Sequence, residues 1–552
     1  MSLFALCGIG GLINTALADA PSRAAIASAH PMATEAGMAI LRSGGNAFDA
    51  AVTVSAVLGV VEPYSSGFGG GGFWLLHRAK DGRQVMVDGR ERAPLSADRD
   101  LFLDEQGKVV PRLSIDGPLS AGIPGLPAAL VHLARNYGRL PLAATLQPAI
   151  EIAEQGFPVD PHYQRMARWR LEILRTYSGS RKQFLAQAEV PEVGYLVRQP
   201  DLAQTLRRLA DQGVDGFYRG ETARRLVQGV REAGGIWTLE DLARYKVVER
   251  EPVTGTYNGL RIISAAPPSS GGVALITMLN ILKDRNFHTR SEPQRTHLLI
   301  EAMRRAYRDR AEYLGDPDFV PVAVERLTHA WYAAGLSRDI RMDRATSVGD
   351  EEPVSLEEGR DTTHFSILDK AGNRVAATLS VNYPFGSGFV PPGTGVLLND
   401  EMDDFSARPG TPNVYGLVGG EANAIAGGKR MLSSMSPTFV EDADRVAILG
   451  TPGGSRIITM VLLAILDMAD GKGPETWVSR PRFHHQYLPN EIQFESNALS
   501  ESLQRQLRNM GHRLKPLEGD YGNMQAILWH RTTGDVEAAS DPRGIGLARV
   551  SH

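Results

Sequence analysis

The residues with the clearest chemical potential lie at the junction of Asp361 and Thr362. Residues 349–359, just upstream, are charged and poor in strand formers, which predicts an exposed loop. Residues 363–369, just downstream, alternate between polar and apolar side chains, as in a half-buried strand. If the peptide bond before Thr362 were cut, this residue would carry both a nucleophilic hydroxyl and a free α-amine that can act as its base.

A predicted β-hairpin brings further polar side chains to this threonine. Residues 364–369 and 374–382 are predicted to form two strands joined by a tight turn. Folding about that turn pairs Thr362 with the region of Ser380 and Asn382, so the three side chains are expected at one end of a sheet. The alternative is that they decorate a solvated strand face.

The elements that must position these residues follow from the hydrophobic periodicity. Apolar spacing predicts helices over residues 33–43, 47–61, 126–137, 141–155, 221–233, 292–313 and 455–470. Strands are predicted over residues 73–77, 84–88, 261–265, 364–369, 374–382, 438–441, 446–450 and 524–529. The arginine-rich helix 292–313 also contains acids, which indicates a solvated or ion-paired face. The whole pattern predicts layers of helices and antiparallel hairpins.

Composition limits the class of protein and its partners. The 552 residues are 43% hydrophobic and 22% charged, as in an ordinary globular protein, and no linker or internal repeat divides them. The net charge is −4 with the two signs well mixed, which argues against nucleic acid or an anionic membrane as a partner.

The N-terminus has the features of an export signal over residues 1–20. Residues 3–17 are apolar but too few to span a bilayer, and residues 16–18 and 18–20 are small-residue cleavage patterns. A basic start is missing, which indicates either a true start further upstream or a weak signal. A buried first helix is the alternative to an export signal. Cys7 is the only cysteine, and its removal with the signal would leave no disulfide or thiol nucleophile. The expected location is periplasmic or secreted.

Ten segments spread over nearly the whole chain resemble the γ-glutamyltranspeptidase family, in the family's order. They are residues 30–37, 44–51, 62–73, 88–94, 267–272, 362–369, 398–405, 432–437, 450–456 and 539–543. The resemblance implies an α+β fold, the four-layer αββα sandwich of the N-terminal nucleophile hydrolases. It also implies self-cleavage between Asp361 and Thr362 into a large subunit, residues 21–361, and a small subunit, residues 362–552, which stay together as a heterodimer.

The resemblance further implies the catalytic residues. Thr362 is expected to be the nucleophile of both self-cleavage and catalysis, and its γ-glutamyl ester is resolved by water or by an amino acid or peptide acceptor. Ser380 stands where a threonine is usual, which keeps the hydroxyl and loses one methyl group. The amides of Gly453 and Gly454 are expected to form the oxyanion hole. The expected donors are glutathione and glutamine-like compounds, and neither a metal nor a cofactor is required.

A γ-glutamyl group carries a carboxylate and an ammonium on one carbon, so its pocket needs both signs of charge. The resemblance implies that Arg90 binds the carboxylate, because a guanidinium can do so bidentately. The hydroxyls of Ser433 and Ser434 are expected to assist it. Glu91 and Arg92 flank Arg90 and are expected to be surface charges or ion-pair partners.

The ammonium is expected to be held by Glu401, Asp404 and Asn382. Two acids so close in sequence could equally bind a cation or form a solvated loop. Residues 405–429 form a long irregular stretch that resembles the lid over the donor site of bacterial relatives, with Tyr415 at its tip.

Two residues depart from the family's usual pattern, and glycine-rich segments give weak signals of phosphate binding. Tyr383 and Pro384 differ from the residues usual after Asn382, which leaves donor or acceptor preference open. The turn 450–454 also suggests phosphate binding, but the lysine and hydroxyl of a P-loop are missing. The glycine run 69–72 follows no clear strand, which suggests close backbone packing instead.

Three functions compete on this sequence. The first is γ-glutamyl transfer and glutathione hydrolysis. The second is a cephalosporin or glutaryl acylase with the same machinery, which would be expected to lose Arg90 or the acids at 401 and 404. The third is a processed but inactive binding scaffold, which would be expected to lack the nucleophile or an oxyanion glycine. All of these residues are present.

Overall fold

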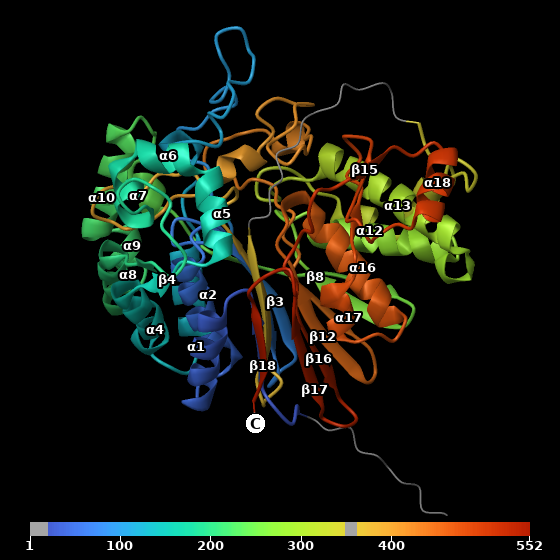
Figure 1. Cartoon of the computed structure of the whole chain (residues 1–552), viewed down its shortest axis with the longest axis horizontal. Helices are drawn as coiled ribbons and strands as arrows, with labels where there is room; N and C mark the ends of the chain where they lie inside the picture. The colour runs from blue at the N-terminus through green and yellow to red at the C-terminus, as the bar shows by residue number, and fades with distance from the viewer. Residues whose placement is uncertain (1–19, 348–361, 552) are drawn as a thin grey trace, which may run out of the picture.

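The computed structural model describes residues 20–347 and 362–551. Two sheets stack face to face in the middle of the molecule, and helices cover the outer face of each (Figure 1). One apolar cluster lies between the sheets, and one larger cluster joins each sheet to its helices. This is the predicted four-layer αββα sandwich.

Both sheets combine strands from the two sides of position 362. The seven-stranded sheet has the order β18 (Leu547–Val550), β1 (Ala25–Ser28), β9 (Thr363–Leu368), β10 (Arg374–Ser380), β2 (Gly71–Arg78), β3 (Arg83–Gly89) and β6 (Val248–Arg250). The six-stranded sheet has the order β17 (Val536–Ser540), β16 (Gln525–His530), β12 (Arg445–Gly450), β11 (Thr438–Glu441), β8 (Leu260–Ser264) and β7 (Val253–Tyr257). All neighbours in these two sheets are antiparallel. Two fragments cut at position 362 would therefore share both sheets.

The helices divide between the two outer layers. On the seven-stranded sheet lie α1 (Pro31–Arg42), α2 (Ala47–Val61) and α3 (Leu126–Asn136), and the same apolar cluster includes α4 (Leu142–Gln155), α8 (Pro200–Gln212) and α10 (Gly220–Glu232). On the six-stranded sheet lie α12 (Gly271–Asp284), α16 (Ile457–Ala469) and α17 (Pro474–Ser479). Of the other helices on this side, α13 (Glu292–Tyr313) and α15 (Ala330–Ser337) pack on α12, and α18 (Glu501–Asn509) packs on α13. In the described residues, no helix has the length and apolar character needed to cross a membrane.

Shorter elements complete the chain. The helices are α5 (Pro161–Trp169), α6 (Leu171–Thr176), α7 (Ser178–Phe184), α9 (Asp215–Tyr218), α11 (Leu239–Ala243) and α14 (Val324–Leu327). The strands β4 (Phe157–Pro158) and β5 (Leu196–Val197) pair with each other, and β13 (Phe483–His484), β14 (Ile492–Phe494) and β15 (Leu514–Pro516) form a third small sheet.

The periodicity predicted these boundaries closely. Helices α2 and α13 and strand β11 match their predicted bounds to the residue, and the other predicted elements end within two residues of the observed positions. Of the two alternatives for α13, the ion-paired face is confirmed and the solvated face is wrong, because Glu301 on this helix is buried and paired with Arg304 and Arg305. The predicted loop 349–359, Asp361 and residues 1–19 of the predicted signal lie outside the described residues.

The central hairpin is more deeply buried than its sequence pattern predicts. All residues of β9 and β10 are buried, so the half-buried strand and the solvated-face alternative are both wrong. Phe365 packs into the helix layer, whereas Leu368 packs against the second sheet. The polar positions between the sheets bond to one another: the ring of His364 lies 2.8 Å from the Thr378 hydroxyl. The alternating pattern therefore separates two buried faces rather than core from solvent.

Candidate active site

The hairpin register brings Thr362 to Ser380, as predicted. Leu379 of β10 pairs with Thr363 of β9, so the next position on each strand is Ser380 and Thr362. The two hydroxyl oxygens lie 3.4 Å apart, and the Ser380 hydroxyl accepts a hydrogen bond from the backbone N–H of Asn382 at 2.8 Å. The second hydroxyl is therefore held by the backbone in contact with the nucleophile.

Glycines beside this hairpin make the close approach possible. A Cβ on Gly70 would lie 2.2 Å from the carbonyl oxygen of Ser380, and one on Gly72 would lie 2.6 Å from that of Thr378. Both distances are shorter than any side chain tolerates, so the predicted packing role of the glycine run is confirmed. These glycines support the strand end that carries Ser380.

Thr362 has a strained backbone. Its φ is 139°, in a region that side-chain-bearing residues rarely adopt, and its side chain is branched at Cβ. Such a conformation costs about 1–3 kcal/mol and persists only where the surrounding structure enforces it. The strain lies at the residue whose preceding peptide bond is the predicted cleavage site.

One pocket at Thr362 collects nearly all the predicted site residues. Its other walls are Arg90, Ser380, Asn382, Glu401, Asp404, Tyr415, Leu417, Ser433, Ser434, Met435, Gly454, Ser455 and Ile457. Gly453 is the remaining described residue of the predicted site, and it is the neighbour of Gly454 in the same turn. Arg90 and Asp404 contact each other here, although they are more than 300 positions apart in the sequence.

Arg90 pairs directly with the two acids predicted to hold the ammonium. Its Nη1 contacts Glu401 Oε2, its Nη2 lies 2.5 Å from Asp404 Oδ2, and its Nε donates to the carbonyl of Met431 at 3.3 Å. Arg90 and Glu401 are each 1% exposed, so the solvated-loop alternative for the acids is wrong. The groups predicted to bind the two ends of a donor therefore contact one another in one small pocket.

Glu91 adds a third carboxyl group to this cluster. It is buried and lies 3.5 Å from Arg90 Nη1, so it is an ion-pair partner and its predicted surface position is wrong. Burial and the nearby charge of Glu401 raise the pKa of Glu91 well above its usual range. Burial raises the pKa of Glu401 to about 7, although the charge of Arg90 opposes the shift. Within the described residues, neither Glu91 Oε1 nor Glu401 Oε1 has a hydrogen-bond partner, so acceptor capacity remains in the pocket.

Ser433 and Ser434 line the pocket beside a second arginine that the sequence did not reveal. Arg310 of α13 donates to the Ser434 hydroxyl at 3.4 Å and to the Ser270 hydroxyl at 3.1 Å. The Ser433 hydroxyl accepts from the backbone N–H of Met435. Arg310 is buried and carries positive charge to the serine side of the pocket. Only the tertiary packing of α13 brings it there.

Two further residues missed by sequence reasoning position the acidic loop. The Asn399 side chain accepts from the backbone N–H of Glu401 at 2.9 Å and donates to Gly69 and Gly122 carbonyls. Asp400 accepts from the N–H of Tyr383, and its backbone carbonyl accepts from the Asn382 amide. The predicted motif at 398–405 contains both residues, which was the available signal.

The predicted oxyanion turn has the expected local structure. Gly453 and Gly454 follow β12 with φ angles of 136° and 54°, and a short 3₁₀ turn, Gly454–Arg456, leads into α16. Neither amide donates a hydrogen bond to another described residue. Two adjacent unpaired N–H groups before a helix suit a developing oxyanion.

Tyr415, from the segment 405–429 that is predicted to be a lid, contacts this turn. The Tyr415 hydroxyl donates to the Asn382 carbonyl at 2.7 Å, and a Cβ on Gly454 would lie 2.8 Å from the tyrosine ring. Tyr415 is 7% exposed. The residue that departs from the usual pattern, Tyr383, does not line the pocket; its ring packs edge-on against Trp169 instead.

Replacing Tyr415 by Phe tests the contribution of the lid. The ring stays over Gly454, but the hydrogen bond to the Asn382 carbonyl is lost, so we expect KM for the donor to rise about 2- to 10-fold with kcat nearly unchanged. Steady-state kinetics of donor hydrolysis measure the effect. A fall in kcat with constant KM would instead assign the hydroxyl to the chemical step.

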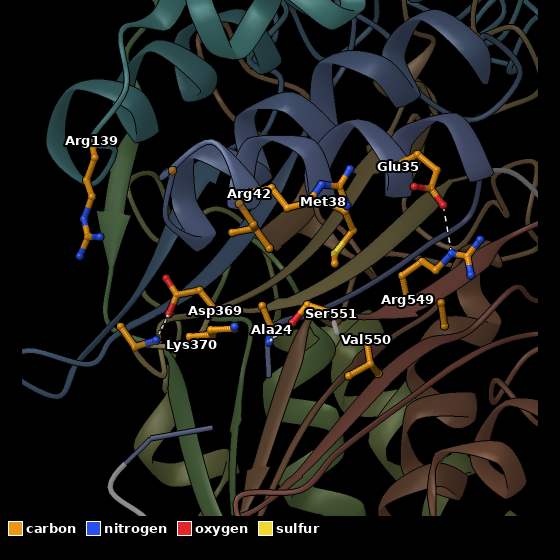
Figure 2. A pocket seen from close by; sticks show the side chains of 14 residues that line it. Ala24, Glu35, Met38, Arg42, Arg139, Asp369, Lys370, Arg549, Val550 and Ser551 are labelled. Carbon is orange, nitrogen blue, oxygen red and sulfur yellow. Dashed lines mark hydrogen bonds and ion pairs between the residues drawn. The ribbon is translucent and has the colours of Figure 1, made fainter. Parts of the chain in front are cut away.

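A larger cavity, of about 1,000 Å³, is lined by none of the described residues predicted for the active site (Figure 2). Asp369 and Lys370 line it at the far end of β9, roughly 20 Å along the strand from Thr362. An exposed pair between Glu35 and Arg549, 3.0 Å apart, forms part of its wall. It therefore takes no part in the chemistry at Thr362.

One group of described residues has the composition of a metal site. Ligand atoms of His297, Glu301 and His512 lie within 4.8 Å of one another. His297 Nδ1 and His512 Nε2 are 2.7 Å apart, however, and Glu301 is already paired with Arg304 and Arg305. The group is better described as a buried hydrogen-bonded network.

Comparison with known proteins places the chain in a family. A model of the family described as Gamma-glutamyltranspeptidase matches residues 33–551. The glutathione hydrolase proenzyme of Escherichia coli (strain K12) is 41% identical over 527 residues, which cover 94% of this chain and 90% of that protein.

Solved structures agree with this family assignment. A cephalosporin acylase from Bacillus halodurans superposes with a TM-score of 0.85 at 29% identity and covers 99% of both chains. The γ-glutamyltranspeptidase of Helicobacter pylori superposes with a TM-score of 0.57 at 40% identity and covers 61% of this chain and 95% of that one. The chain belongs to the γ-glutamyltranspeptidase family of N-terminal nucleophile hydrolases.

Proposed function

We propose that the chain is the precursor of a γ-glutamyltransferase and glutathione hydrolase whose nucleophile is Thr362. The observation that carries the proposal is the contact of Thr362 with Ser380 inside a pocket that holds Arg90, Glu401 and Asp404 together. A γ-glutamyl group is a zwitterion at its α-carbon. It can enter this pocket without changing the pocket's net charge, because its carboxylate can take Arg90 as a partner while its ammonium takes the acids.

Self-cleavage comes first in this proposal. The Thr362 hydroxyl attacks the carbonyl of Asp361, the peptide becomes an ester, and hydrolysis of the ester frees the Thr362 α-amine. The strained φ of Thr362 supports this step, because opening the peptide bond relieves the constraint. The products are the large subunit 21–361 and the small subunit 362–552, and the shared sheets keep them together as a heterodimer.

Acyl transfer follows at the same hydroxyl. The freed α-amine takes the hydroxyl proton, the oxygen attacks the γ-amide carbonyl of the donor, and the amides of Gly453 and Gly454 stabilise the oxyanion. The leaving amine takes the proton, and a γ-glutamyl ester remains on Thr362. Water or the amino group of an amino acid or peptide then resolves the ester. Glutathione and glutamine-like compounds are the proposed donors.

A cephalosporin or glutaryl acylase is the second candidate, and the structural likeness to a cephalosporin acylase favours it. A glutaryl group lacks the ammonium, so it would leave the acids at 401 and 404 without a cationic ligand. The inactive-scaffold alternative is disfavoured because the nucleophile and the oxyanion turn lie in one assembled site.

Removal of the export signal 1–20 would deliver the enzyme to the periplasm or outside the cell.

The deciding experiment uses the purified, self-processed protein. A γ-glutamyl anilide is supplied with and without a dipeptide acceptor, and both released aniline and γ-glutamyl dipeptide are measured. We expect release in both cases and dipeptide product only with the acceptor. No release from the γ-glutamyl anilide, together with release from a glutaryl anilide, would replace the proposal by the acylase.

Arg90→Lys tests donor binding separately from the chemistry. Lysine keeps the charge but loses the bidentate geometry, so KM for the donor should rise while self-cleavage persists. Loss of one charge-assisted partner in a buried pair commonly costs about 2–5 kcal/mol. A variant that fails to cleave but binds donor normally would assign Arg90 to processing instead.

A further inference from the structure

A small cavity of about 280 Å³ opens between the two sheets, at the end opposite to the nucleophile. Residues of both sheets form its walls, among them His77, Arg261, Arg374, Glu441, Trp529 and Arg531. Arg374 begins β10 and Ser380 ends it, so the cavity lies roughly 20 Å along this strand from the hydroxyl groups at Thr362. It shares no lining residue with the donor pocket and is a separate space.

The lining of this cavity carries more positive than negative charge. Arg261, Arg374 and Arg531 supply three guanidinium groups. Glu441 is the one acid among the described lining residues, and its carboxylate lies 2.7 Å from Arg374 and 3.7 Å from each of the other two arginines. These arginines form no other ion pair within the described part of the chain. One carboxylate is thus shared by three cations, which leaves an excess of two positive charges.

The protonation states preserve this excess at neutral pH. Burial lowers the pKa of Arg374 to about 10, and the charge of Glu441 opposes this shift. The like charges of Arg531 and Arg261 lower the pKa further, so Arg374 stays protonated but is destabilised by its neighbours. Burial and the charge of Arg374 lower the pKa of His77 to about 3, so its ring is neutral. Burial opposes the ionisation of Glu441, but the nearby arginine charges hold its pKa below the usual range.

Three nitrogen atoms of the lining residues have no hydrogen-bond partner among the described residues. They are Arg374 Nε, Trp529 Nε1 and His77 Nδ1, and each of them is buried. The first two are N–H groups that can only donate. Arg374 is 2% exposed, so its unpaired donor carries the cost of burying a charged group without its hydrogen bond. Water can accept such a bond, whereas an anion can also balance the charge.

We propose that this cavity binds phosphate, as the free ion or as the phosphate group of a small molecule, through Arg261, Arg374 and Arg531. The fork of a guanidinium group matches two phosphate oxygens, and a dianion neutralises the excess of two positive charges. A volume of about 280 Å³ admits a group of this size but lies below the usual range for drug-sized ligands. The proposal does not depend on acyl transfer at Thr362.

Bound phosphate would connect the two sheets and the two sides of the cleavage site. Arg261 of β8 precedes position 362, whereas Arg374 of β10 and Arg531, which follows β16, come after it. Glu441 of β11 already joins the sheets through its hydrogen bond from Arg374, at 2.7 Å. A ligand held by all three arginines adds contacts that exist only in the folded protein, so phosphate should stabilise it against unfolding.

The principal test is isothermal titration calorimetry of the purified protein with inorganic phosphate, at constant ionic strength in chloride. We expect saturable binding with a Kd of about 1 mM or lower, and Arg531→Ala should raise this Kd about 10-fold or more. Arg83→Ala is the matched control, because this exposed arginine pairs with Glu249 and does not line the cavity, so the Kd should not change. Equal effects of the two substitutions, or phosphate that chloride displaces equally well, would overturn the site.

Glu441→Gln separates a binding site from a merely structural cluster of ion pairs. The amide keeps the shape of the side chain but loses the charge that competes with phosphate, so the Kd should fall about 10-fold. The unfolding temperature without phosphate should also fall, because the three arginines lose their shared counter-charge. Calorimetry measures the first effect, and thermal unfolding followed by circular dichroism measures the second. Lower stability without a gain in phosphate affinity would reject the proposal.

Two further measurements identify the source of the phosphate group and separate this site from the chemistry. Competition by glycerol 3-phosphate would extend the site to phosphate groups on organic molecules, whereas phosphate binding without such competition would restrict it to the free ion; both results support the cavity. Hydrolysis of a γ-glutamyl anilide by Arg531→Ala should equal that of the wild type, because the cavity is remote from Thr362. A protein that binds phosphate but does not hydrolyse the anilide would reject only the proposed function. A protein that hydrolyses it without saturable phosphate binding would reject only this site.

Discussion

Thr362→Ala should leave the chain as one uncut polypeptide without acyl-transfer activity. The wild type should separate under denaturing conditions into fragments of about 37 and 21 kDa, in proportion to their residue counts after loss of the signal. The variant lacks the Thr362 hydroxyl, which is the proposed nucleophile for the carbonyl of the preceding peptide bond. Gel electrophoresis and N-terminal sequencing of the small fragment measure the result.

Thr362→Ser provides the matched control for this substitution. Serine keeps the hydroxyl and loses only the methyl group that restricts its rotamers, so the chain should still cut itself, but more slowly. A small fragment that begins at any residue other than Thr362 would contradict the mechanism. So would rapid cleavage of the alanine variant.

Asp404→Asn should lower kcat/KM for a γ-glutamyl donor roughly 30- to 4,000-fold. This factor corresponds to an activation free energy higher by about 2–5 kcal/mol. The amide has the same shape, but it cannot balance the charge of Arg90, whose Nη2 lies 2.5 Å from the Asp404 carboxylate. It also removes one of the two anions that an ammonium would meet. Steady-state kinetics with a γ-glutamyl anilide provide the measurement.

The same variant assayed with a glutaryl anilide is the internal control. A glutaryl group has no ammonium, so the wild type should hydrolyse it poorly, because the buried acids lose their cationic ligand. The substitution should then barely change the glutaryl rate. Wild-type protein that hydrolyses both anilides equally well would favour the acylase and reject the proposed ammonium site.

The local elements of the fold were predictable from the sequence because they depend on near neighbours. Helices α2 and α13, of 15 and 22 residues, each begin at a capping box formed by near neighbours, and the β9–β10 hairpin has a turn signal that sets its register. The contact of Thr362 with Ser380 follows from that register alone. The family motifs named the pocket residues correctly as a group, although not how they contact one another.

Contacts between distant parts of the chain depended on the tertiary structure. The pairing of Arg90 with Glu401 and Asp404 joins positions 311 and 314 residues apart, and Arg310 reaches the pocket only because α13 packs against it. Burial of β9 on both faces requires the second sheet, which no pattern within β9 encodes. Glu62 was part of a recognised motif, but only the tertiary structure shows that none of the described basic side chains forms an ion pair with it. Charge balance and burial are sums over all surrounding groups, whereas periodicity is a property of one segment.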